Sequence, residues 1–161
     1  MDNAELEKQL TILQDIEAIK QLKAEYCDIC DDDHNQDRIV TIFAEDGIWE
    51  GKGVGYAKGP AELRKLFKSF AERISFSQHN VFNPRIKVKG TEAHGSWYFL
   101  GPFTFRKDNR QMWLAARYED DYVKINGTWK FKHLRAFGRM AAPYEEGWAS
   151  RAKADVFSNE L

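Results

Sequence analysis

The chain has 161 residues, of which 43% are hydrophobic, and its formal net charge is −1 at pH 7. This length allows one domain with a sizeable core. The composition excludes a disordered chain, and the charge gives no electrostatic reason to bind nucleic acid. Aromatic residues reach 14% of the sequence, with 5 Trp and 11 Phe. So many flat side chains favour a cavity with aromatic walls.

The sequence predicts a protein of the reducing cytoplasm that does not enter a membrane. Its N-terminus, Met1–Glu5, is polar and acidic, unlike a signal peptide, and no apolar run approaches the length of a membrane span. Cys27 and Cys30 have the CxxC spacing of a redox or metal pair. Because no second pair is present, we interpret them as two small residues of a helix.

Helices dominate the first half of the chain. Apolar residues recur at helical spacing near the N-terminus, and Lys58-Gly59-Pro60 marks the start of a later helix because Pro suits the first turn. Gly47 is expected to end a short helix. The expected elements are a helix over residues 3 to about 30, a helix over Asp37–Phe43, strands at Ile48–Glu50 and around Tyr56, and a helix from Pro60 to about Ile74.

The second half of the chain is rich in strand signals. Asn126-Gly127, between alternating segments, is typical of a two-residue hairpin turn. Lys107–Arg110 predicts another turn, and Gly101-Pro102 predicts a bulge or sharp bend within a strand. The expected strands cover residues 78–89, 92–106, 111–125 and 128–138.

Three helices followed by a meander of long strands predict an α+β fold. We expect a strongly curved antiparallel sheet wrapped on the helices, with a conical cavity between them. Residues 1–140 would form this single domain. Residues 141–161, with Pro143, Tyr144 and Trp148, would form a C-terminal lid or an arm between subunits.

A histidine and a distant carboxylate are the first candidates for chemistry. His79 lies in a polar break of the strand pattern, and the first helix runs into the acidic residues Asp31, Asp32 and Asp33. The predicted fold would bring His79 and a carboxylate of this cluster together, and an imidazole oriented by a carboxylate in a dry pocket is a general base. Alternatively, His79 is a structural histidine and the acidic residues form a solvated surface. A metal site at Asp31–His34 is not expected, because consecutive side chains point in different directions.

Four segments carry a resemblance to a known family, the SnoaL-like branch of the nuclear transport factor 2-like superfamily. They are Asp15–Leu22 with Tyr26, Tyr56–Pro60, Leu114–Tyr122 and Gly127–Phe131. The chain resembles the dehydratase and dehydrochlorinase members over residues 15 to 138. The resemblance implies a cystatin-like α+β barrel and a lyase that uses a His–Asp dyad and no cofactor.

Matched position by position, the resemblance assigns the dyad to His79 and Asp31 and a catalytic tyrosine to Tyr26. It implies that the following residues contact the substrate: Trp49, Trp97, Phe99, Leu114, Ala116 and Tyr118. On an ideal helix Tyr26 and Asp31 lie about 140° apart, so they would reach one substrate from adjacent walls. A second carboxylate of the family falls on Gly101, and an arginine falls on Leu134, which leaves the electrophilic partner open.

We therefore expect a cofactor-independent lyase, a dehydratase or related elimination enzyme, for a small hydrophobic cyclic or aromatic substrate. An isomerase that moves a double bond, or a retro-aldol lyase, could use the same dyad. A protein that only binds a ligand is the alternative outside enzymes. No metal and no nucleic acid partner is expected. A homotrimer is the first expectation and a dimer the second, with Trp129, Phe131 and Phe137 as an apolar strip on the outer face of the sheet.

Overall fold

Three helices and a seven-stranded sheet make up the described part of the chain, residues 2–149 of a computed structural model. The helices are α1 (Asn3–Asp31), α2 (Gln36–Ile42) and α3 (Gly59–Arg73). The strands are β1 (Phe43–Gly51), β2 (Gly55–Lys58), β3 (Ile74–Ser77), β4 (Asn80–Lys89), β5 (Glu92–Phe105), β6 (Arg110–Ile125) and β7 (Thr128–Pro143). The predicted α+β class is confirmed.

The sheet is mixed rather than purely antiparallel as expected. Its strand order is β2-β1-β7-β6-β5-β3, and β4 also pairs with β5. All pairs are antiparallel except β1 with β7, which run parallel. Successive strands joined by short turns must run antiparallel, whereas β1 and β7 are separated by most of the domain, so no hairpin fixes their relative direction.

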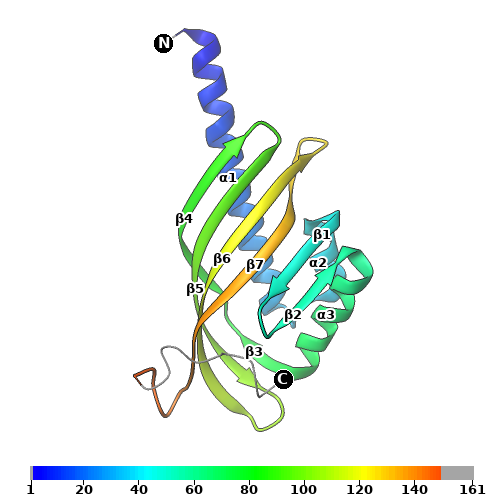
Figure 1. The fold of residues 1–161 in the computed structure, drawn as a ribbon, viewed down its shortest axis with the longest axis vertical. Helices are drawn as coiled ribbons and strands as arrows, with labels where there is room; N and C mark the ends of the chain where they lie inside the picture. Colours follow the sequence, from blue (N-terminus) through cyan, green and yellow to red (C-terminus); the bar gives the residue numbers. More distant parts are fainter. Residues whose placement is uncertain (1, 150–161) are drawn as a thin grey trace.

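The long strands β4 to β7 lie across α1 and curve strongly, while α2, α3, β1 and β2 group at one side (Figure 1). The inner face of α1 buries Ile19, Leu22, Tyr26 and Ile29 in the core between helix and sheet. The first turns of α1 extend beyond the sheet (Figure 1). None of the described helices has the length and apolar content needed to cross a membrane.

The expected helix end at Gly47 is wrong, because α2 already ends at Ile42 and Gly47 lies inside β1. A Cβ atom at Gly47 would lie 2.8 Å from the backbone oxygen of Ala44 and 3.0 Å from that of Phe131. The glycine therefore allows β1 to approach β7 closely, at a point where the register of the two strands shifts.

The strand expected over residues 78–89 begins only at Asn80, as β4, and a further strand, β3, precedes it, with Gln78 and His79 between the two. Both strands pair with β5, on either side of Gly101-Pro102. A Cβ atom at Gly101 would collide with the backbone oxygen of Gln78. The predicted irregularity at Gly101 thus exists, and its effect is to make room for the chain that carries His79.

A bulge in β7 overturns the expected apolar strip on the outer face. Tyr122 pairs with Phe131 and Asp121 pairs with His133, so Lys132 is an extra residue in β7. Such an insertion reverses which side chains face the core. Trp129 and Phe131 are therefore buried, whereas Phe137 is exposed.

The end of the domain also differs from the expectation. Strand β7 continues to Pro143, so the segment assigned to an arm begins inside the sheet. A turn over Tyr144–Glu146 follows. Most of the predicted lid or arm, residues 150–161, lies outside the described residues.

Candidate functional site

His79 and Asp31 are in direct contact, although they lie far apart in the sequence. The Nδ1 atom of His79 lies 2.6 Å from Oδ1 of Asp31, and the backbone N–H of His79 donates to Oδ2 at 2.8 Å. The hydroxyl of Ser77 donates to Oδ1 at 3.0 Å. The carboxylate therefore holds both the ring and the backbone of His79, as well as the end of β3.

Electrostatics keep this carboxylate ionised. Burial acts to raise the pKa of Asp31, but the hydrogen bonds from His79 and Ser77 outweigh it and lower that pKa below its usual value. Because an ionised carboxylate can only accept, the hydrogen between the two groups belongs to Nδ1 of the imidazole. The other ring nitrogen, Nε2, is then the one that can accept a proton.

An apolar cavity of about 90 Å³ lies in front of the imidazole, between α1, α3 and the curved sheet. Its walls include His79 itself, whose side chain is only 6% exposed. The predicted site residues in the walls are Tyr26, Trp49, Phe99, Leu114, Ala116 and Tyr118. Asp31 lies behind His79 and does not line the cavity.

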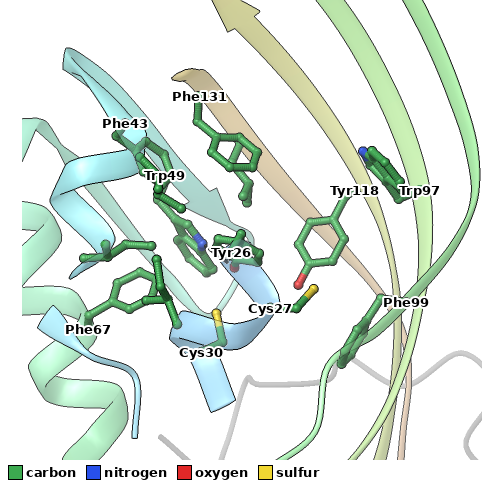
Figure 2. Close-up of a cluster of buried hydrophobic side chains, with 14 of the residues drawn as sticks. Tyr26, Cys27, Cys30, Phe43, Trp49, Phe67, Trp97, Phe99, Tyr118 and Phe131 are labelled. Atoms are coloured by element: carbon green, nitrogen blue, oxygen red, sulfur yellow. Dashed lines mark hydrogen bonds between the residues drawn. The ribbon is translucent and has the colours of Figure 1, made fainter. Parts of the chain in front are cut away.

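Trp97 is the predicted contact residue that the structure places elsewhere. It is buried, but it is absent from the cavity walls, and its indole N–H donates to the hydroxyl of Tyr122 at 3.1 Å. Figure 2 shows Trp97 beyond Tyr118, away from Trp49 and Cys30. Its partner strand β6 carries the contact to the cavity instead, through Tyr118.

Tyr26 occupies the wall next to the imidazole. Its ring meets that of His79 edge-on, with 6.4 Å between the ring centroids, and its hydroxyl accepts a hydrogen bond from Trp49 Nε1 at 3.0 Å. Burial raises the pKa of Tyr26 well above its usual value. The hydroxyl therefore keeps its proton and is a hydrogen-bond donor at neutral pH.

Two polar residues of the cavity were not predicted, and the first is His34. It is 5% exposed, and its ring lies 6.0 Å from that of His79, centroid to centroid. Among the described residues, neither ring nitrogen of His34 has a hydrogen-bond partner. Burial is the main reason why the pKa of His34 is lowered to about 3, and nearby His79 adds to it. In the sequence His34 only continues an acidic run, which favoured an exposed position.

The second residue is Arg73, at the end of α3, which brings a cation to the cavity wall. Its guanidinium donates to the backbone oxygen of Ser69 at 2.9 Å and to the Ser69 hydroxyl at 3.2 Å. Leu134, where the family resemblance had placed an arginine, lies instead on β7 and does not line the cavity. Position-by-position matching could not find Arg73 for that reason.

Behind the cavity, a buried ion pair joins α1 to β6. Lys23 Nζ lies 2.9 Å from Asp120 Oδ2, and both side chains are 0% exposed. The ammonium of Lys23 also lies 3.5 Å from the centre of the Tyr118 ring, and the Tyr122 hydroxyl donates to Asp120 at 3.0 Å. Burial raises the pKa of Asp120, and Lys23 opposes that rise. The pair fixes the far side of the Tyr118 wall.

Two other histidines and two arginines lie outside the cavity. His94 contacts Asp121 and Glu119, and His133 contacts Glu50. Arg117 and Arg135 form ion pairs with Glu119 and Asp121 respectively. Neither histidine lines the cavity.

One group in the described part of the chain has the spacing to hold a metal ion. Cys30, His34 and His79 each offer one ligand atom, and these atoms lie within 4.8 Å of one another. Sulfur and imidazole donors are those that zinc prefers. The acidic run Asp32–Asp33 takes no part in this group.

The SnoaL-like domain family matches residues 11–135 of this chain. Gamma-hexachlorocyclohexane dehydrochlorinase from Sphingobium indicum is 25% identical over 117 residues, which cover 70% of this chain and 73% of that enzyme.

Solved structures agree with the sequence comparison. The dehydrochlorinase LinA-type3 from Novosphingobium barchaimii LL02 superposes with a TM-score of 0.77 and is 25% identical, covering 84% of this chain and 93% of that one. A protein from Novosphingobium aromaticivorans, provisionally named a scytalone dehydratase, gives a TM-score of 0.74 at 25% identity, covering 85% and 92%. The fold and the family resemblance are thus confirmed.

Proposed function

Because the chain belongs to the SnoaL-like family, we propose that it is a cofactor-independent lyase. It removes a proton and a leaving group from a small hydrophobic cyclic or aromatic molecule. Relatives named as a dehydrochlorinase and as a dehydratase support elimination as the class of reaction. Within this class we favour loss of water, which makes the protein a carbon–oxygen lyase.

The single observation that carries this proposal is the 2.6 Å contact between His79 and Asp31 at the wall of an apolar cavity. Asp31 accepts from Nδ1 and thereby directs Nε2 of His79 toward the substrate. Nε2 removes a proton from carbon, and the electrons of that C–H bond form the new double bond. Asp31 then stabilises the imidazolium, because an opposite charge in contact favours the charged form.

Tyr26 would assist the departing group. Its hydroxyl accepts from Trp49 and also interacts with the Cys30 thiol; an oxygen of the substrate, a stronger acceptor than sulfur, would take the hydroxyl hydrogen over from that thiol. Phe99, Leu114, Ala116 and Tyr118 would hold the apolar body of the substrate against the base. A well-placed base contributes roughly 10²- to 10⁴-fold to the rate, and orientation in a dry site supplies much of the rest.

The central test replaces the base and its partner. We expect His79→Asn to lower kcat by roughly 10²- to 10⁴-fold while substrate binding persists, and Asp31→Asn to lower kcat as well because the ring loses its orientation. His133→Asn is the matched control, since His133 has a carboxylate partner but lies outside the cavity. Undiminished turnover in His79→Asn would refute the assignment.

Two alternatives on the same dyad are distinguishable by product. An isomerase would exchange a substrate proton with solvent deuterium and conserve the substrate mass, whereas a dehydratase releases water. A retro-aldol lyase would release a carbonyl fragment. If compounds bind but stay unchanged, the protein is a ligand-binding protein instead.

The proposal includes independence from metal. Activity should survive exhaustive treatment with a chelator, because proton abstraction by His79 needs no Lewis acid. Loss of activity that returns on addition of Zn²⁺ would instead assign Cys30, His34 and His79 as ligands. We further propose that the protein works in the cytoplasm as a homotrimer, a setting in which its two buried free thiols stay reduced.

A further inference from the structure

We propose that His34 is a catalytic residue, the hydrogen-bond donor to a substrate carbonyl oxygen next to the carbon that His79 deprotonates. This inference rests on the proposed function and narrows it: the substrate is an oxygenated ring, a β-hydroxy carbonyl compound, rather than an organohalide or hydrocarbon. His34 thereby takes the place of the electrophilic partner that the family resemblance had left open.

The first support is a polar side chain at the cavity that has no hydrogen-bond partner among the described residues. His34 is 5% exposed, and it lines the same cavity as His79. No hydrogen bond joins a ring nitrogen of His34 to another described residue, and neither nitrogen is among the fully enclosed polar atoms that lack a partner. The ring nitrogens therefore keep surface that a small molecule can reach. Since polar groups inside proteins nearly always have a partner, a ligand oxygen is the partner that the cavity can supply.

The second support is the backbone that turns this ring inward. Asp33 and His34 both adopt left-handed conformations, each with φ of 51°. The N–H of His34 donates to the backbone oxygen of Cys30 at 3.2 Å, which folds the chain back over the end of α1. Two consecutive non-glycine residues in this region are unfavourable and often mark functional positions.

The third support is the distance between the two imidazoles. One nitrogen of His34 lies within 4.8 Å of a nitrogen of His79. A carbonyl oxygen and the hydrogen on the adjacent carbon can therefore contact both rings at once. The Phe67 and Phe70 rings beside His34 exclude water from this hydrogen bond, which strengthens it.

The electron flow balances without any added reagent. Nε2 of His79 takes the proton, and the C–H electrons move into the carbonyl group, whose oxygen becomes an enolate held by the N–H of His34. When the carbonyl re-forms, the bond between the β-carbon and its hydroxyl breaks. The departing oxygen takes the proton back from His79 and leaves as water, and Tyr26 donates to it on the way.

The test uses two probes of the same shape, cyclohexanone and methylenecyclohexane, with the full-length protein. We expect the ratio of the two affinities, ketone over hydrocarbon, to fall roughly ten-fold in His34→Leu, because the carbonyl oxygen would then be buried without a donor. His34→Gln keeps a donor and should keep most of the preference. The carbonyl stretch of bound cyclohexanone should lie at lower frequency in the wild type than in His34→Leu.

The outcome does not depend on turnover. The ketone preference should persist in His79→Asn, so failure of the base assignment and failure of this proposal are separate results. An equal affinity ratio in the wild type and His34→Leu would overturn it. So would an unchanged carbonyl frequency, or failure of the wild type to bind cyclohexanone at all.

Discussion

Asp31 shows how one side chain can organise a site. Its two oxygens accept from the His79 ring, the His79 backbone and the Ser77 hydroxyl. The residue closes α1, and the groups that it accepts from lie at the break between β3 and β4. Helix and sheet are thus joined at the point where the proposed base stands, and the orientation of the imidazole is part of the fold.

His34 leads to a prediction about stability in acid. The variant His34→Gln should gain stability relative to the wild type as the pH falls, by about 2–3 kcal/mol between pH 7.5 and pH 4.5. Urea unfolding at several pH values measures this difference. At pH 7.5 the imidazole is neutral in both states of the chain, so the two proteins can be compared there as the reference.

The direction of this stability change follows from the number of protons that the folded and unfolded states bind. In the unfolded chain the imidazole binds a proton near pH 6.5, whereas in the folded protein the pKa of His34 is about 3. The unfolded state therefore binds more protons between these values, and folding becomes less favourable as the pH falls through 6.5. Glutamine does not titrate and escapes this loss. A constant difference between the two proteins over this range would contradict the neutral, buried imidazole.

At the scale of residues, the sequence predicted the contact of His79 with Asp31 and most of the aromatic wall. It missed His34 because a left-handed conformation in two non-glycine residues has no signal in composition or spacing. It misplaced Trp97 because strand alternation alone does not say how deep in a curved sheet a side chain lies. Trp97 is buried as expected, but against Tyr122 rather than the cavity.

Among the elements, the tightest contact is that of β5, at Gly101, with the backbone of Gln78 just before β4. Gly101→Ala should destabilise the protein by about 1–3 kcal/mol, because the new methyl group meets the backbone of Gln78. Turnover should fall further than the loss of folded protein explains, since His79 follows Gln78. Activity assays at temperatures where the variant is fully folded measure this.

Gly90→Ala is the matched control for that experiment. Gly90 has a φ of 61° and nothing within 4 Å of an added Cβ atom, so alanine there costs about 1 kcal/mol through the backbone alone. It lies at the turn after β4, away from the cavity. Equal loss of turnover in both variants would show that Gly101 does not position His79.

The buried ion pair between α1 and β6 supports a second prediction about elements. Lys23→Met should destabilise the protein by about 3–5 kcal/mol, because Asp120 would remain buried without its partner. The double variant with Asp120→Leu should recover part of this loss. Thermal or urea unfolding of the two single variants and the double variant measures the coupling. Additive losses would mean that the charges do not depend on each other.

Element boundaries show what sequence patterns could and could not supply. The hairpin at Asn126-Gly127 was predictable, and both residues have the positive φ that such a turn requires. The bulge at Lys132 was not, because no glycine or proline marks it. That one extra residue decides whether Trp129 and Phe131 face the core. Because both are buried, the apolar strip expected on the outer face of the sheet does not form.

For the whole molecule, assembly is the property to measure. Since Trp129 and Phe131 are buried, the exposed apolar side chains are found elsewhere, including Leu6, Leu10 and Leu13 on the projecting turns of α1. We expect light scattering to give the mass of a homotrimer. Replacement of these three leucines by glutamate should lower that mass if the projecting turns take part, and Leu→Ala replacements test packing without added charge.

The parallel pairing of β1 with β7 has a consequence for how the protein folds. Strands β4 to β7 join neighbours in the sequence, whereas β1 must wait for a strand made near the end of the domain. Contacts between distant segments are slow to form because closing a long loop costs entropy. We expect β4 to β7 to pair early. The part of the cavity wall that contains Trp49 forms only when β1 pairs with β7. We therefore expect a newly made chain to pass through a sheet-rich state in which the cavity beside His79 is still open on one side.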